Sequence, residues 1–185
     1  MTTRALIGMT ISHVALNAVL FQVVWFAAVL GAAHGAPWLG WGALALLAAQ
    51  ALTTPHWRID LAFAVVCMAI GFLVDSMWSW SGILVYDGPG LAPGWIVALW
   101  AAVGLSLNHS LGWFRTRAIL GGIAAGAIAP LSYLAGERLG AVNVPVPTLL
   151  GWIALVWAPV FAILFALAGT LDHHTKTTVV REERS

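Results

Sequence analysis

Long apolar runs separated by short polar segments occupy most of this chain of 185 residues. A transmembrane helix needs about 20 predominantly apolar residues. Because unsatisfied backbone groups are costly in hydrocarbon, we expect each run to be helical. Proline, glycine, threonine and charged residues mark the breaks between the runs. The predicted helices lie at about 9–32, 37–52, 59–78, 94–114, 118–137 and 146–171.

These runs predict an all-α fold, namely a polytopic membrane protein built as a bundle of six transmembrane helices. No linker divides the chain, so we expect residues 1–171 to form one transmembrane domain and residues 172–185 a polar cytoplasmic tail. The apolar stretch 11–32 is longer than the core of a usual signal peptide, which has about 7–15 residues. We therefore expect this stretch to stay as the first helix.

Composition and charge support the membrane class and add an orientation. Hydrophobic residues make up 61% of the chain and charged residues 8%, against about 25% charged residues in a soluble domain. In the six-helix arrangement Arg138 stands alone on one side, and the other basic residues share the opposite side. The positive-inside rule then places both termini in the cytoplasm. The residues on the cytoplasmic side are Arg4, Arg58, Arg115, Arg117, Lys176, Arg181 and Arg184.

Polar side chains inside the spans are the candidate site residues, because such groups are expensive in a membrane and tend to face the bundle interior. A candidate polar site toward the cytoplasm has four members. Asn17 and Asn108 fall at similar depths, so we expect an amide contact between helices one and four. The site is either interhelical hydrogen-bond glue or a polar pocket with His109 as proton carrier or headgroup ligand. Its members are Asn17, Gln22, Asn108 and His109.

A second candidate polar site lies toward the outer surface. An isolated buried carboxylate is unfavourable, and the sequence therefore predicts that Asp75 pairs with Arg138. This set is either a structural ion pair with interface charges that reach the headgroups, or an acidic site for a lipid headgroup or polar substrate. Its members are Asp75, Tyr133, Glu137 and Arg138.

Helix five carries small residues at helical spacing, which let another helix approach closely. Pro130 removes one backbone hydrogen bond from that helix and should kink it near the middle. We expect this face to make helix–helix contacts, including contacts with a partner protein. The helix-packing residues are Gly122, Gly126, Pro130, Gly136 and Gly140. Among the tryptophans, Trp25, Trp100 and Trp157 fall deep in the spans and are expected to line a packed interior.

Motifs typical of several enzyme classes are missing from the sequence. It has no His-x-x-x-His array on a helix, no Gly-x-Ser-x-Gly elbow and no Walker loop. We therefore expect no cofactor and no metal, and we favour a role without catalysis. The net charge of +1 and the scattered basic residues argue against nucleic acid as a partner. The expected partners are the lipid bilayer and either another membrane protein or a second copy of the chain.

Several of these polar and aromatic positions form motifs that resemble a bacterial inner-membrane family catalogued as domain of unknown function 2878. The resemblance extends from helix one to the start of helix six, and its last motif is the most specific. Ala129 stands where the family often has glycine. The motifs are Asn17 with Phe21-Gln22 and Trp25-Phe26, Asp75-Ser76, Pro93-x-Trp95, Leu99-Trp100, His109-Ser110-Leu111 with Trp113, Pro130-Leu131-Ser132-Tyr133 and Arg138-Leu139-Gly140-Ala141.

The resemblance implies a small multi-pass protein of the bacterial inner membrane without an assigned activity, and it implies a link to membrane-lipid modification or envelope stress. Three roles stay open. The chain is an accessory or assembly factor for lipid modification, a small transporter or carrier of a lipid or small molecule, or an intramembrane enzyme that uses Asp75 and His109. The large difference in depth between those two residues argues against a shared catalytic centre.

Overall fold

The computed structural model describes the backbone of residues 3–88 and 90–182, and the side chains of residues 12–88 and 90–171. This part of the chain is helical, and one antiparallel bridge between Val85 and Asn143 joins two loops. The elements are α1 Thr3–Ala33, α2 Trp38–Leu52, α3 Trp57–Trp80, α4 Gly94–Gly104, the 3-10 helix η1 Gly112–Thr116, α5 Ala118–Arg138, the 3-10 helix η2 Pro147–Leu149 and α6 Leu150–Glu182.

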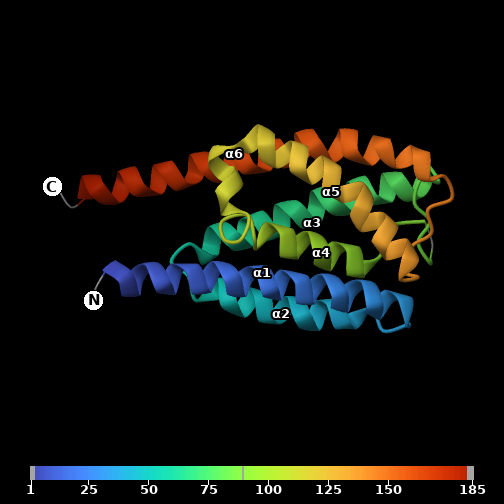
Figure 1. The fold of residues 1–185 in the computed structure, drawn as a ribbon, viewed down its shortest axis with the longest axis horizontal. Helices are drawn as coiled ribbons and strands as arrows, with labels where there is room; N and C mark the ends of the chain where they lie inside the picture. The colour runs from blue at the N-terminus through green and yellow to red at the C-terminus, as the bar shows by residue number, and fades with distance from the viewer. Residues whose placement is uncertain (1–2, 89, 183–185) are drawn as a thin grey trace.

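The helices pack as three consecutive pairs, with α1 against α2, α3 against α4, and α5 against α6 (Figure 1). Helix α4 also contacts α1 and α2, so it lies at the centre of the bundle. The start of α1 and the end of α6 lie at the same end of the molecule, and the α3–α4 and α5–α6 loops lie together at the other end (Figure 1).

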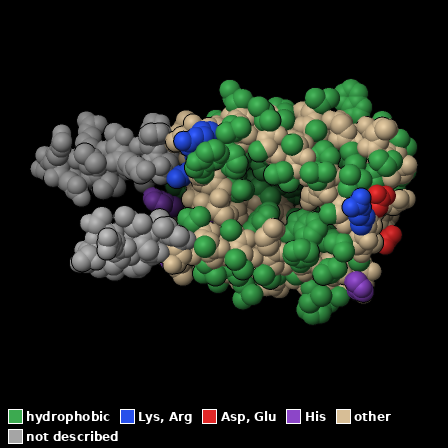
Figure 2. All heavy atoms as spheres, viewed as in Figure 1, with side chains coloured by type: hydrophobic (Ala, Val, Ile, Leu, Met, Phe, Trp, Pro, Cys, Tyr) green, Lys and Arg blue, Asp and Glu red, His purple; other side chains and the backbone are tan. Residues whose placement is uncertain are grey.

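Four helical segments of the described chain are long and apolar enough to cross a membrane, and they indicate a membrane protein. They are Ser12–Ala33, Trp57–Trp80, Ala118–Arg138 and Pro147–Leu171. Hydrophobic side chains cover much of the visible surface between the two ends, and the visible Lys and Arg side chains lie at the ends (Figure 2). The six predicted helices are therefore present, but α2 with 15 residues and α4 with 11 residues are shorter than these four.

Helix α4 corrects the prediction of a helix over 94–114. It ends at Gly104, after which the chain turns through residues 105–111 and enters η1. Ser106 donates its hydroxyl hydrogen to the carbonyl oxygen of Ala102 at 2.8 Å. Such side-chain bonds to the backbone compete with helical pairing. A prediction from hydropathy makes this helix too long because the turns after Gly104 also contain buried apolar residues, Leu105 and Leu107.

The small residues of α5 bring it close to α6. A Cβ added at Gly122 would lie 2.4 Å from the carbonyl oxygen of Ala158, and one added at Gly126 would lie 2.8 Å from the Ala158 Cβ. Helix α6 of the same chain therefore occupies the part of α5 that was expected to be open to a partner. Pro130 lies within α5, and Gly140, just after the helix, has a φ of 85°. Left-handed φ values of this kind favour glycine.

Candidate functional site

Asp75 of α3 is fully buried and accepts hydrogen bonds from three neutral donors. The Tyr133 and Tyr86 hydroxyls donate to its Oδ1 at 2.6 and 2.7 Å, and Trp100 Nε1 donates to its Oδ2 at 2.7 Å. Both O–H···O distances lie within the usual range for such hydrogen bonds. The donors come from α5, from the α3–α4 loop and from α4, so Asp75 joins three segments that are distant in sequence.

Two local features place these donors. Gly71 lies one helical turn before Asp75, and a Cβ added there would lie 2.0 Å from the Trp100 indole. The missing side chain therefore makes the space in which the indole reaches the carboxylate. The Ser76 hydroxyl oxygen accepts the Ala92 N–H at 3.0 Å and fixes the loop that carries Tyr86.

The environment of Tyr86 keeps its phenol a hydrogen-bond donor. Tyr86 is buried in the loop and packs edge-on against Trp95 with ring centroids 5.9 Å apart. Burial, and then the nearby Asp75 carboxylate, raises the pKa of the Tyr86 phenol well above its ordinary value of 10.0. The phenol therefore stays protonated at neutral pH.

Of the four residues grouped in the predicted outer site, the structure brings Asp75 and Tyr133 into contact, whereas Glu137 and Arg138 make no hydrogen bond to them. Asp75 does not pair with Arg138, which is exposed, because neutral donors satisfy the carboxylate instead. Glu137 accepts the Val144 N–H at 2.8 Å through Oε1 and thereby holds the α5–α6 loop. Glu137 is thus a loop-stabilising residue in this structure.

A second buried carboxylate, Asp60, lies near the other end of α3 and was missed in the sequence. It accepts the Asn108 amide at 2.9 Å and the Thr54 hydroxyl at 3.3 Å, and His109 Nε2 lies 3.0 Å from its Oδ2. Arg115 donates to the Asn108 oxygen at 3.4 Å. The position of Asp60 in the first turn of an apolar helix could have indicated a buried site. Acidic residues are also common at helix N-termini for electrostatic reasons, so this position alone did not distinguish the two.

Asn17 does not contact Asn108 as predicted. Its amide nitrogen donates to Gln50 Oε1 at 3.0 Å and to the Leu105 carbonyl at 3.4 Å, and its oxygen accepts the Ser110 hydroxyl at 2.7 Å. The prediction treated residues 94–114 as a straight helix, whereas the chain turns after Gly104 and brings Ser110 to Asn17. Asn108 then faces Asp60.

These two networks explain why an interrupted helix is tolerated here. Non-helical backbone at membrane depth must be satisfied inside the protein. Asn17 binds both the Leu105 carbonyl and the Ser110 backbone N–H, the latter at 3.2 Å, while Asp60 fixes two side chains of the same segment. These side chains therefore form hydrogen bonds between the helices and the turns that follow α4.

A cavity of about 550 Å³ lies between α1, α4, α5 and α6. Its wall includes two Asp75 donors, Trp100 and Tyr133, and Trp100 stacks on Trp157 at a centroid distance of 4.1 Å. Ligand pockets in proteins commonly have volumes of about 300–1,000 Å³ and are mostly apolar with a few polar groups. The other polar or aromatic residues in the wall are Phe21, Gln22, Trp25, Phe26, Trp95, Phe114, Ser132, Phe161 and Phe165.

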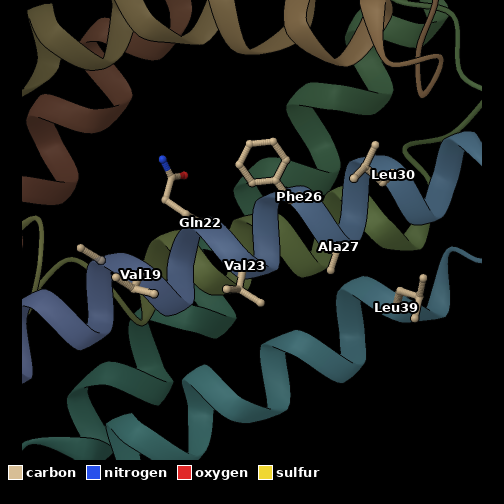
Figure 3. A pocket seen from close by; sticks show the side chains of 8 residues that line it. Val19, Gln22, Val23, Phe26, Ala27, Leu30 and Leu39 are labelled. Carbon is tan, nitrogen blue, oxygen red and sulfur yellow. The ribbon is translucent and has the colours of Figure 1, made fainter.

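Gln22 and Phe26 also line a shallow groove of about 650 Å³ on α1, so these two side chains border both the groove and the cavity. Figure 3 shows Gln22 and Phe26 extending from one side of α1 and Leu39 approaching from α2. Gln22 is exposed and is not part of the Asn17 network, contrary to its predicted grouping. It lies at the mouth of the cavity instead.

One hydrogen bond crosses the cavity mouth between α1 and α5. Trp25 Nε1 donates to the Ser132 hydroxyl oxygen at 3.0 Å. Ser132 retains its own hydroxyl hydrogen for a further acceptor. Trp25, Trp100 and Trp157, expected in the interior, all line this cavity. Among the side chains described, no group of three His, Cys, Asp or Glu residues is arranged to hold a metal.

The helical fold and its four helical segments long and apolar enough to cross a membrane indicate the class of polytopic helical membrane proteins. Residues 14–164 match the model of a family described as "Protein of unknown function (DUF2878)", and the chain belongs to that family. No curated protein and no solved structure matches the chain. The family identified from sequence motifs is thus confirmed.

Proposed function

We propose that this protein binds a single-chain amphipathic lipid in the cavity between α1, α4, α5 and α6, as a membrane-embedded carrier. The observation that carries the proposal is that Gln22 and Phe26 of α1 border both this cavity and an apolar groove on the outer side of α1. Val19, Val23 and Phe26 in that groove are exposed apolar side chains, which suit contact with lipid. A chain that enters sideways from the bilayer meets an apolar path.

The cavity wall suits such a ligand. Aliphatic and aromatic side chains supply most of the surface, which favours a hydrocarbon chain. Gln22 and Ser132 offer hydrogen-bonding groups near the mouth, where a polar headgroup would lie. The contacts of α1 with α2 and α4 are extensive, whereas Trp25 and Ser132 supply its hydrogen bond to α5. Local separation of α1 and α5 would widen the mouth.

We infer that the chain crosses the bacterial inner membrane six times, with both termini in the cytoplasm. The positions of three arginines support this orientation. Arg58 lies in the first turn of α3, and Arg115 and Arg117 lie between α4 and α5, at the end that also holds the start of α1 and the end of α6 (Figure 1). The short helices α2 and α4 run alongside longer ones (Figure 1). Their flanking loop segments supply the remaining length.

The other two roles have less support. An accessory factor that binds a partner through Gly122 and Gly126 would need a face that α6 covers. An enzyme that uses Asp75 with His109 would need them together, but His109 contacts Asp60, which lies roughly 22 Å from Asp75 at 1.5 Å per residue along α3. Presentation of a bound lipid to a modifying enzyme is compatible with the carrier proposal and uses the same cavity.

Photo-crosslinking in phosphatidylcholine liposomes tests the proposal, with a long-chain alcohol that carries a diazirine as the probe. We expect labelling of Leu99 and Val103, which are partly buried on the central helix and line the cavity. Ala125→Phe should fill the cavity and abolish this labelling. The matched control Ala127→Phe lies on the exposed face of α5 and should retain it.

Size-exclusion chromatography identifies the folded variants, so that lost labelling is read only from folded protein. Labelling confined to exposed residues such as Ile123, with none on α4, would overturn the carrier proposal. The same conclusion would follow from equal labelling of Leu99 in the wild type and in folded Ala125→Phe.

A further inference from the structure

We propose that the cavity selects a lipid with a cationic headgroup, such as a long-chain amine or a quaternary ammonium amphiphile. This inference rests on the proposed lipid binding and specifies the chemical class of the ligand. Three features carry it: a buried carboxylate directly behind the cavity wall, aromatic rings in the intervening wall, and a lining without charged side chains.

The first feature is the charge of Asp75. The carboxylate is fully buried, and phenol and indole groups supply its hydrogen bonds. Hydrogen bonds donated to a carboxyl group favour its ionised form, and these neutral donors add no positive charge that would cancel it. The ion pair found in the described part of the chain joins His109 and Asp60, toward the other end of α3. Arg138, the expected partner of Asp75, is exposed.

The second feature is the aromatic wall between this charge and the cavity. Trp100 and Tyr133 each donate to Asp75 and also line the cavity, so only one side chain separates the carboxylate from the ligand space. The face of an indole ring attracts cations, and tryptophan is the most effective side chain in this respect. The Trp100 face that stacks on Trp157 is closed to a ligand, so a cation can meet only the remaining ring surface of this wall. Trp95 and Trp157 add further rings to the wall.

The third feature is the charge of the lining itself. Its residues include no Lys, Arg, His, Asp or Glu side chain among those described. A cationic headgroup would therefore meet no repulsive side chain in the wall and would be attracted by Asp75. An anionic headgroup in the same place would be repelled by that carboxylate and would find no basic residue. Interactions of this kind are strong where water is excluded.

Competition in neutral phosphatidylcholine liposomes tests this selectivity on the wild-type protein. Three competitors share one saturated chain and carry a trimethylammonium, a hydroxyl or a carboxylate headgroup. For each competitor, the assay measures how much the labelling of Leu99 by the diazirine alcohol decreases. Because the three compounds partition differently between water and lipid, each competing concentration is the amount measured in the liposome bilayer. We expect the ammonium compound to compete at a concentration at least about tenfold lower than the carboxylate compound.

Asp75→Asn should reduce the preference for ammonium over carboxylate to near one, measured as the ratio of the two competing concentrations within that variant and therefore independent of how tightly it binds the alcohol. The matched control Asp87→Asn changes an exposed acid in the α3–α4 loop and should preserve the preference. If folded Asp75→Asn keeps the full preference, the role of Asp75 is overturned. If that variant does not fold, the wild-type headgroup series decides the inference by itself.

The two proposals fail in different ways. Equal competition by the three headgroups, or a preference for the carboxylate, overturns the cationic selectivity while labelling of Leu99 by the alcohol still supports lipid binding. Absence of alcohol labelling on α4 overturns lipid binding itself, and the selectivity with it.

Discussion

The two buried acids of α3 differ in what surrounds them. Asp60 and Asp75 are both inaccessible to solvent, and the carboxyl group of each lies within hydrogen-bond distance of three other side chains. The partners of Asp60 include Asn108 and His109, which belong to the turns that follow α4. Two partners of Asp75, Trp100 and Tyr133, line a cavity. A buried acid in a span is therefore a strong site candidate when its own donors also face unfilled space.

The difference has a physical origin in how each carboxylate is used. Near Asp60, the chain leaves the helical path inside the bundle, and the acid satisfies donors that would otherwise lack partners. Near Asp75, the acid holds two aromatic side chains in the wall of the cavity. We therefore expect substitutions at the Asp60 end to reduce stability most, and those at the Asp75 end to change ligand binding as well.

The largest expected effect comes from Asp60→Ala. Removal of this acceptor leaves the partly buried Asn108 and His109 side chains without it, and each donor that loses its partner costs about 1–3 kcal/mol of unfolding free energy. Thermal unfolding in detergent, followed by circular dichroism, measures the change. Asp87→Ala, at an exposed position, serves as control and should unfold like the wild type. Equal stability of both variants would contradict a structural role for Asp60.

A smaller loss is expected from Gly71→Ala. The new Cβ would overlap the Trp100 indole, so the ring must move away from Asp75, and overpacking of this kind costs about 1–3 kcal/mol. Gly42→Ala is the matched control because its Cβ would meet no atom within 4 Å. The same unfolding assay compares the two. We also expect Gly71→Ala, but not Gly42→Ala, to weaken labelling of Leu99 by the alcohol probe. Unchanged labelling in Gly71→Ala would contradict a role for Trp100 in ligand binding.

The smallest expected change in unfolding free energy comes from Tyr86→Phe, and it depends on pH. At neutral pH the variant should lose about 1 kcal/mol, because Tyr133 still donates to the same Asp75 oxygen. The folded state raises the pKa of Tyr86 above its ordinary value of 10.0, so its contribution is complete below pH 10 and declines above it, where the unfolded chain releases the proton.

Unfolding of both proteins at pH values on either side of 10 checks this sign. The stability advantage of the wild type over Tyr86→Phe should shrink as the pH rises above 10. An advantage that grows in this range would show that Tyr86 is ionised in the folded protein and is not a hydrogen-bond donor to Asp75.

The sequence indicated part of the candidate site. The rest was missed because it depends on contacts between residues that are distant in the sequence. Asp75 and Tyr133 stood out as polar groups in apolar runs, and the structure joins them across 58 positions. Trp100 was expected in the interior, but its bond to Asp75 depends on the space at Gly71, a feature that concerns two helices at once. Gln50 and Asp60 were missed because their partners, Asn17 and Asn108, lie 33 and 48 positions away.

The sequence by itself determined the all-α class, the positions of six helices and the family of this protein, because apolar run length and chain breaks are local properties. Only the tertiary structure decided that α4 stops at Gly104, that α6 covers the small face of α5, and that two donors of Asp75 line a cavity. Each of these depends on groups brought together from distant parts of the chain. Hydropathy records the preference of a residue for lipid or water, whereas a site depends on which side chains satisfy one another.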